Sequence, residues 1–154
     1  SVAILLYLAR KYKTPDHWYP SDLQKRARVD EYLAWHHANT RVKASKVFSF
    51  KVLLPLITGQ PLPPEKLEGL IEELNVVLKQ FEEKFLQDKP FLAGSEVSLA
   101  DLVAVVELIQ PVCAGYDIFA GRPTLAAWRR RVEDAVGKQL FQEAHEEIMN
   151  ASTL

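Results

Sequence analysis

Apolar residues recur at intervals of three and four along most of the chain, which is the period of an amphipathic helix. The clearest stripe follows Pro64 and comprises Leu67, Leu70, Ile71, Leu74, Val77, Leu78, Phe81 and Phe85. Pro64 itself suits the first turn of a helix, where a missing N–H costs no hydrogen bond. The pattern predicts one long helix here, with its glutamates and lysines on the outer face.

The same period predicts further helices with short joints between them. They are expected over residues 1–12, 21–45, 47–57, 99–109, 124–136 and 140–148. Ser21 and Gln24 have the spacing of a capping box, and Thr124 is expected to cap the helix that follows it. The apolar stretch 47–57 is expected to continue the helical path of residues 21–45 until Pro55 disturbs it. No strand pattern or internal repeat competes, so we expect an all-α fold, a bundle of six to eight helices.

The helix after Ser98 is apolar on almost every side, which predicts that it is buried at the centre of the bundle. Ser98 can cap this helix while Asp101 reaches back to the Ser98 backbone N–H. Val97 and Leu102 flank the cap as a hydrophobic staple would. A carboxylate on a core helix could also act as a base, but the capping geometry accounts for Asp101 fully, and we assign both residues a structural role.

Composition excludes several kinds of function. The chain has 154 residues, 48% of them hydrophobic, and a formal net charge of −1. A near-neutral chain offers no strong field for nucleic acid or an anionic membrane, and we expect neither as a partner. No apolar run reaches the length of about 20 residues that spans a bilayer. The single cysteine, Cys113, fits a reducing compartment, and we expect a cytoplasmic protein.

The remaining candidate side chains point to packing more than to chemistry. His36 and His37 are adjacent, whereas two metal ligands on one helix need spacings of three or four, so no metal site is expected. Cys113 is expected to be a core thiol. The other residues expected to pack or to face solvent, rather than to react, are His17, His145, Arg129, Arg130, Arg131, Trp18, Tyr19, Trp35 and Trp128.

Several runs resemble one known family. Residues 91–101, FLAGSEVSLAD, resemble the signature of the C-terminal domain of glutathione transferases. Residues 1–12 are similar to the last helix of that family's thioredoxin-like domain. Residues 16–35, 121–128 and 141–145 are similar to mammalian theta-class members. The resemblance implies three parts: residues 1–13 as the last helix of a truncated thioredoxin-like domain, 14–20 as a linker, and 21–154 as the all-helical C-terminal domain.

The resemblance also implies an activity for the parent enzyme. Such enzymes join the glutathione thiolate to small electrophiles such as alkyl or aralkyl halides and epoxides, and some reduce organic peroxides. Glutathione is a co-substrate, and no further cofactor is implied. The serine that activates the thiol belongs to the thioredoxin-like domain, so we expect no catalytic residue in this chain and no activity from it alone. The chain would supply the wall of the electrophile pocket and part of a homodimer contact.

Two residues match glutathione-binding positions of the family. Ser1 matches a serine that holds the γ-glutamyl end at a helix N-terminus, where N–H groups and the helix dipole favour a carboxylate. Arg41 matches an arginine whose planar fork suits a glutathione carboxylate or a leaving anion. Ser1 could instead be a simple helix cap, and Arg41 a solvated cation. Ala38 stands where some relatives carry an aspartate, so a polar contact is lost there.

Two other interpretations remain open at this point. Related helical domains occur as non-catalytic interaction modules in translation factors and synthetase assemblies. The chain could also be a fragment of an incomplete gene, because it begins within a helix and ends at residues 150–154, before the tail that covers the site in the family.

Overall fold

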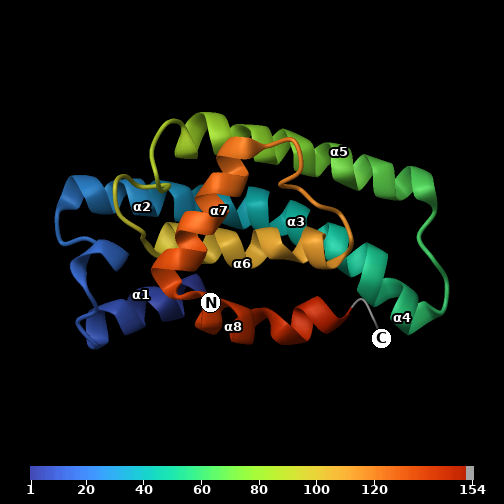
Figure 1. The fold of residues 1–154 in the computed structure, drawn as a ribbon, viewed down its shortest axis with the longest axis horizontal. Helices are drawn as coiled ribbons and strands as arrows, with labels where there is room; N and C mark the ends of the chain where they lie inside the picture. Colours follow the sequence, from blue (N-terminus) through green and yellow to red (C-terminus); the bar gives the residue numbers. More distant parts are fainter. Residues whose placement is uncertain (152–154) are drawn as a thin grey trace.

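Helices account for the architecture of residues 1–151, which are the residues that the computed structural model describes (Figure 1). Within this range there is no strand, only an isolated bridge between Phe91 and Gly94. The α-helices are α1 (Val2–Lys11), α2 (Leu23–His36), α3 (Val42–Phe48), α4 (Leu54–Thr58), α5 (Pro64–Gln80), α6 (Leu99–Cys113), α7 (Pro123–Val136) and α8 (Lys138–Asn150). The all-α bundle predicted from the sequence is confirmed.

Helix α6 lies at the centre, as its apolar sequence predicted. It packs against α2, α3, α7 and α8 (Figure 1). Ten of its residues are buried, including Asp101 and Glu107. The capping box is present: Asp101 Oδ2 accepts from the Ser98 backbone N–H at 2.9 Å, and Ser98 Oγ accepts from the Ala100 N–H at 3.3 Å.

The helical path from Leu23 to Thr58 is continuous, in agreement with the expectation that the stretch 47–57 continues the helix before it. Two π-helical segments, His37–Arg41 and Ser49–Leu53, join α2 to α3 and α3 to α4. Pro55 does not interrupt the path; it stands in the first turn of α4, directly after the π-helical segment Ser49–Leu53. The apolar period of the sequence did not reveal the two π-helical segments.

Two predicted caps were wrong by one or two residues. Asp22, rather than Ser21, caps α2, and its carboxylate accepts from the Lys25 N–H at 2.8 Å. The Ser21 N–H instead donates to Asp16, in the 3-10 turn Asp16–Trp18 that lies in the expected linker. Helix α7 begins at Pro123 and has no side-chain cap, because Pro123 already fixes the first helical turn.

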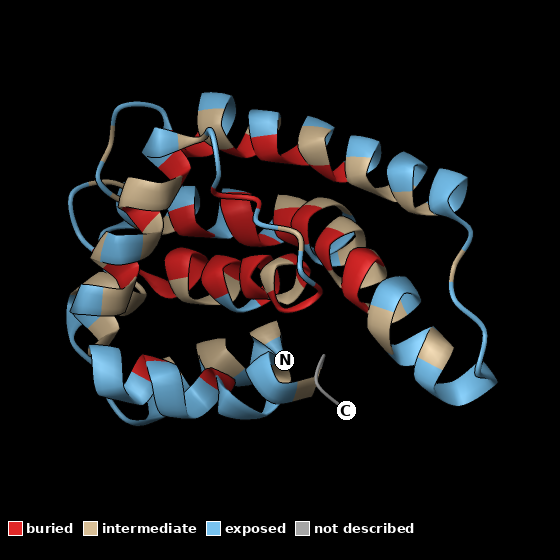
Figure 2. Ribbon diagram, turned by 45° about the vertical axis from the view of Figure 1, so that its right-hand side comes forward, coloured by how far each residue is buried: buried red, intermediate tan, exposed pale blue. Residues whose placement is uncertain are grey.

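Burial follows the predicted faces (Figure 2). The predicted stripe of α5 and the π-helical segment Phe81–Leu86 turns inward, and its members from Leu74 to Phe85 are buried. Trp128 of α7 is fully buried, while α1 has no buried residue. Among the described residues, no helix combines the length and the apolar character that crossing a lipid bilayer requires.

Candidate functional site

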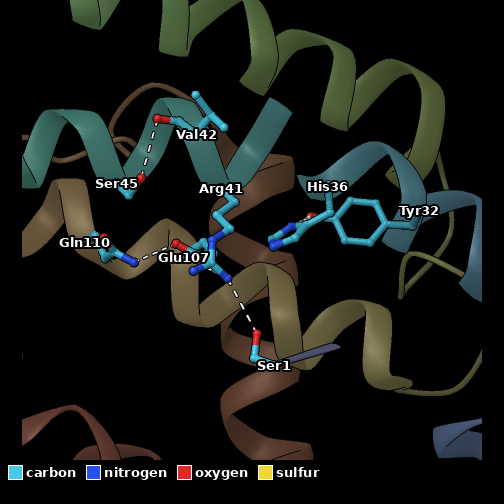
Figure 3. A network of polar contacts seen from close by, with 8 residues as sticks. All are labelled: Ser1, Tyr32, His36, Arg41, Val42, Ser45, Glu107 and Gln110. Carbon is cyan, nitrogen blue, oxygen red and sulfur yellow. Dashed lines mark hydrogen bonds and ion pairs between the residues drawn. The ribbon is translucent and has the colours of Figure 1, made fainter. Parts of the chain in front are cut away.

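Ser1 and Arg41, forty residues apart in sequence, meet at one place in the structure (Figure 3). Arg41 is the last residue of the π-helical segment His37–Arg41, and its Nη1 lies 3.5 Å from the Ser1 hydroxyl oxygen. Ser1 occupies the N-cap position of α1, yet its side chain makes no capping hydrogen bond to that helix. Its hydroxyl is therefore directed to the arginine rather than used as a cap.

A buried carboxylate from the central helix completes this group. Glu107 Oε1 lies 3.9 Å from Arg41 Nη1, and Glu107 Oε2 accepts a hydrogen bond from Gln110 Nε2 at 2.6 Å (Figure 3). The Glu107 side chain is 11% exposed and that of Arg41 47%. Burial raises the pKa of Glu107, whereas Arg41 and Gln110 lower it. Sequence reasoning missed Glu107, although a lone acidic residue in an otherwise apolar core helix was a usable signal.

His36 stands beside the same group, one turn before Arg41. Its ring lies between Tyr32 and the arginine in Figure 3, and its Nδ1 is 3.0 Å from the Tyr32 hydroxyl. Its other ring nitrogen, Nε2, is buried and has no hydrogen-bond partner among the described residues. Burial above all, then the nearby Arg41 and His37, lowers the pKa of His36 to about 4. The imidazole is therefore neutral near pH 7.

This arrangement places one cation, the Arg41 guanidinium, beside the N-terminus of α1, where an anion could bind. The first N–H groups of α1 have no acceptor within their own helix, and the helix dipole adds partial positive charge there. Arg41 Nη1 contacts Ser1 and Glu107, while no hydrogen bond involves Arg41 Nε or Nη2 within residues 1–151. Such a site can bind a carboxylate. It includes no pair of groups arranged for nucleophilic attack.

Other candidate residues lie elsewhere and have structural partners. Ser45, one turn after Arg41, donates to the Val42 carbonyl of its own helix. Cys113 is buried as the last residue of α6, and burial raises the pKa of its thiol. Arg129 pairs with Glu133, and Arg131 donates to the Pro90 carbonyl. Among the described residues no three His, Cys, Asp or Glu side chains gather as metal ligands would.

Comparison with known proteins decides the family. Residues 46–135 match the family model described as "Glutathione S-transferase, C-terminal domain". The chain belongs to the glutathione S-transferase family. It is 67% identical over 152 residues to "Glutathione S-transferase theta-1" of Gallus gallus, covering 99% of this chain and 58% of that protein. It is 58% identical to the Homo sapiens theta-1 protein, covering 98% of this chain and 63% of the relative. These relatives place it in the theta class.

Solved theta-class structures have the same fold as this glutathione S-transferase domain. The apo form of human glutathione-S-transferase T1-1 superposes with a TM-score of 0.96 at 57% identity, covering 99% of this chain and 64% of that one. A human theta-class enzyme in complex with the glutathione conjugate of 1-menaphthyl sulfate superposes with a TM-score of 0.92, covering 97% and 61%. The chain therefore spans about three-fifths of the length of the relatives it matches.

Proposed function

We propose that this chain is the C-terminal part of a theta-class glutathione transferase that joins the glutathione thiolate to small electrophiles. The division into residues 1–13, 14–20 and 21–154 belongs to this proposal, and its last three residues lie outside those described. Residues 1–13 would close one side of the glutathione site, and residues 21–154 would form the wall of the electrophile pocket. The class assignment and the bound conjugate in a human relative support this function.

The observation that carries the proposal is the contact between Ser1 and Arg41. Ser1 is the N-cap of α1 and Arg41 ends the π-helical segment His37–Arg41, so a hydroxyl and a guanidinium lie 3.5 Å apart at the start of a helix. Each of these groups favours a carboxylate. Glutathione carries two carboxylates, and one of them would bind between Arg41 and the start of α1.

The 154 residues alone would bind glutathione weakly and would not turn it over. Thiolate is the reactive form of glutathione, and its formation needs a donor or a positive charge placed at the sulfur. The Arg41 guanidinium already pairs with the Glu107 carboxylate, and we assign it, together with the Ser1 hydroxyl, to a carboxylate of glutathione rather than to the sulfur. We therefore assign thiol activation to the part of the theta-class enzymes that this chain does not cover.

A chimera tests this division of labour. In it, the 154 residues replace the matched segment of the Gallus gallus theta-1 relative, to which 152 of them align. We expect the chimera to conjugate glutathione to benzyl chloride and the 154-residue chain to show no turnover and a glutathione Kd above about 1 mM. A folded but inactive chimera would contradict the proposed function. Turnover by the 154 residues alone would contradict the assignment of thiol activation elsewhere.

The proposal extends to assembly and location. In the intact parent, this chain would contribute part of a homodimer contact, and the enzyme would act in the cytoplasm. Sedimentation of the chimera measures its assembly directly. A dimer is expected, and a fully active monomer would overturn the proposed homodimer contact.

A further inference from the structure

Arg41 uses only one of its terminal nitrogens in contacts with the protein. Nη1 reaches both the Ser1 hydroxyl, at 3.5 Å, and Glu107 Oε1, at 3.9 Å. Within residues 1–151, no hydrogen bond or ion pair involves Nε or Nη2. These two nitrogens form the side edge of the guanidinium plane, and that edge can hold both oxygens of a carboxylate at once. The contacts of Nη1 therefore leave the bidentate edge available.

Burial and a hydrogen bond hold the Glu107 side chain in place. It projects from the central helix α6, its side chain is 11% exposed, and Gln110 Nε2 donates to Oε2 at 2.6 Å. A buried carboxylate without a compensating charge is costly, so Glu107 depends on a cation at Oε1. The cation present there is Arg41, whose own side chain is half-exposed and would otherwise sample many rotamers.

The other groups facing this pair reinforce it. His36, from α2, is 1% exposed and neutral near pH 7, so it does not compete with Arg41 for the carboxylate. Its Nδ1 contact with Tyr32 holds the ring in place beside the arginine (Figure 3). Arg41 is thus flanked by a fixed neutral ring on one side and a fixed carboxylate on the other.

We propose that Glu107 is a positioning residue that anchors Arg41 Nη1 and thereby presents the Nε–Nη2 edge to a carboxylate of glutathione. This inference rests on the proposed function, because it takes glutathione as the ligand of Arg41. Glu107 does not contact the ligand. It acts through the orientation of Arg41.

Nuclear magnetic resonance of the 154-residue chain tests the anchoring directly, without a ligand. The Nε–H signal of Arg41 is measured in the wild-type chain, in Glu107→Gln and in Glu73→Gln. Glu73 is a matched control because it also pairs with a cation, Lys43 of α3. Unlike Glu107, the Glu73 side chain is half-exposed. We expect the heteronuclear NOE of the Arg41 Nε–H to fall clearly in Glu107→Gln and to stay unchanged in Glu73→Gln. Equal values in all three chains would overturn the proposal.

Titration with glutathione separates this inference from the proposed function. In the wild-type chain, we expect glutathione to shift the Arg41 Nε–H signal, and in Glu107→Gln to need about tenfold more ligand for the same shift. If glutathione shifts Arg41 equally in both chains, Glu107 does not position it and only this inference fails. If glutathione shifts nothing at Arg41 in the wild-type chain, glutathione is not the ligand of Arg41 and this inference fails, while the activity of the chimera still decides the proposed function.

A second variant guards against a general loss of structure. Gln110→Ala leaves both charges in place and removes only the hydrogen bond that fixes Glu107 Oε2. We expect a smaller fall in the Arg41 NOE than in Glu107→Gln, with the amide spectrum of α6 otherwise preserved. An NOE at the wild-type value in Gln110→Ala, together with a lowered value in Glu107→Gln, would confine the anchoring to the charge pair and contradict the role given to Gln110.

Discussion

The indole N–H of Trp128 donates to Asp101 Oδ1 at 2.8 Å, which ties α7 to the cap of the central helix. The same carboxylate accepts from the Leu92 N–H, the Ser98 N–H and the Ser98 hydroxyl. Burial raises the pKa of Asp101, and these donors oppose that rise. Asp101 thus joins the 91–98 loop, α6 and α7 at one point, and its role is structural, as the capping spacing predicted.

Replacing Asp101 with Asn should destabilise the domain strongly. The amide would place a donor against N–H groups that now share an ionised acceptor, and buried charge-assisted hydrogen bonds contribute about 1.5–3 kcal/mol each. We expect the free energy of unfolding to fall by at least about 3 kcal/mol in urea titrations. Ser98→Ala, which removes the capping bond from the Ala100 N–H and only one of the donors to Asp101, should cost about 1 kcal/mol. Similar losses in the two variants would show that the donors converging on Asp101 are not what stabilises the cap.

His36 should make the domain less stable in acid. Its pKa falls from 6.5 to about 4 on folding, so below pH 6.5 the unfolded chain binds a proton that the native state excludes. The stability that depends on neutral His36 is complete above pH 6.5 and is lost as the pH falls to 4, a loss of about 3 kcal/mol. Glu107 acts in the opposite direction, because its pKa is raised.

The variant His36→Gln separates the contribution of His36 to the pH dependence of stability from the contributions of the other titratable groups. Glutamine cannot take up the proton, so the decline in unfolding free energy between pH 6.5 and pH 4 should be about 3 kcal/mol smaller than in the wild-type chain. His37→Gln is the control, since His37 is exposed beside it. Equal pH profiles for the wild-type chain and His36→Gln would be incompatible with a neutral buried imidazole.

The outer face of α1 should govern solubility rather than stability. Ile4 is 62% exposed and Tyr7 57%, so this helix presents large apolar side chains to solvent. Ile4→Glu should change the unfolding free energy by less than about 0.5 kcal/mol. It should also reduce self-association in light scattering, because exposed apolar patches promote association. Leu78→Ala, at a fully buried site, should cost 2–5 kcal/mol by contrast. A large loss of stability in Ile4→Glu would mean that α1 is buried in solution.

The sequence predicted the helices that bury one face, and its prediction failed for a helix cap, whose position can differ by a single residue. The stripe from Leu74 to Phe85 is strongly periodic and was predicted correctly. Ser21 and Asp22 both satisfy the preference for a capping oxygen, and only the packing of Asp16 onto the Ser21 N–H selects Asp22. Capping preferences alone cannot choose between Ser21 and Asp22, because the deciding contact comes from Asp16 in the preceding 3-10 turn.

The candidate site was predictable only in part. Ser1 and Arg41 were named from a family resemblance, and the structure brings them within 3.5 Å. Their role in binding glutathione stays a prediction. The π-helical segment that ends at Arg41, and the ion pair with Glu107, depend on how α3 packs on α6. Neither leaves a periodic signal in the sequence.

The most direct test of the account is the kcat/KM for glutathione of the active chimera with Arg41→Lys. Lysine keeps a positive charge beside Glu107 but lacks the two-nitrogen edge that would hold the carboxylate. The account predicts a loss of about tenfold or more, with unchanged unfolding free energy. Arg28→Lys, an exposed arginine paired with Glu31, should leave the value unchanged. An Arg41→Lys chimera with the wild-type kcat/KM would contradict the claim that Arg41 binds glutathione.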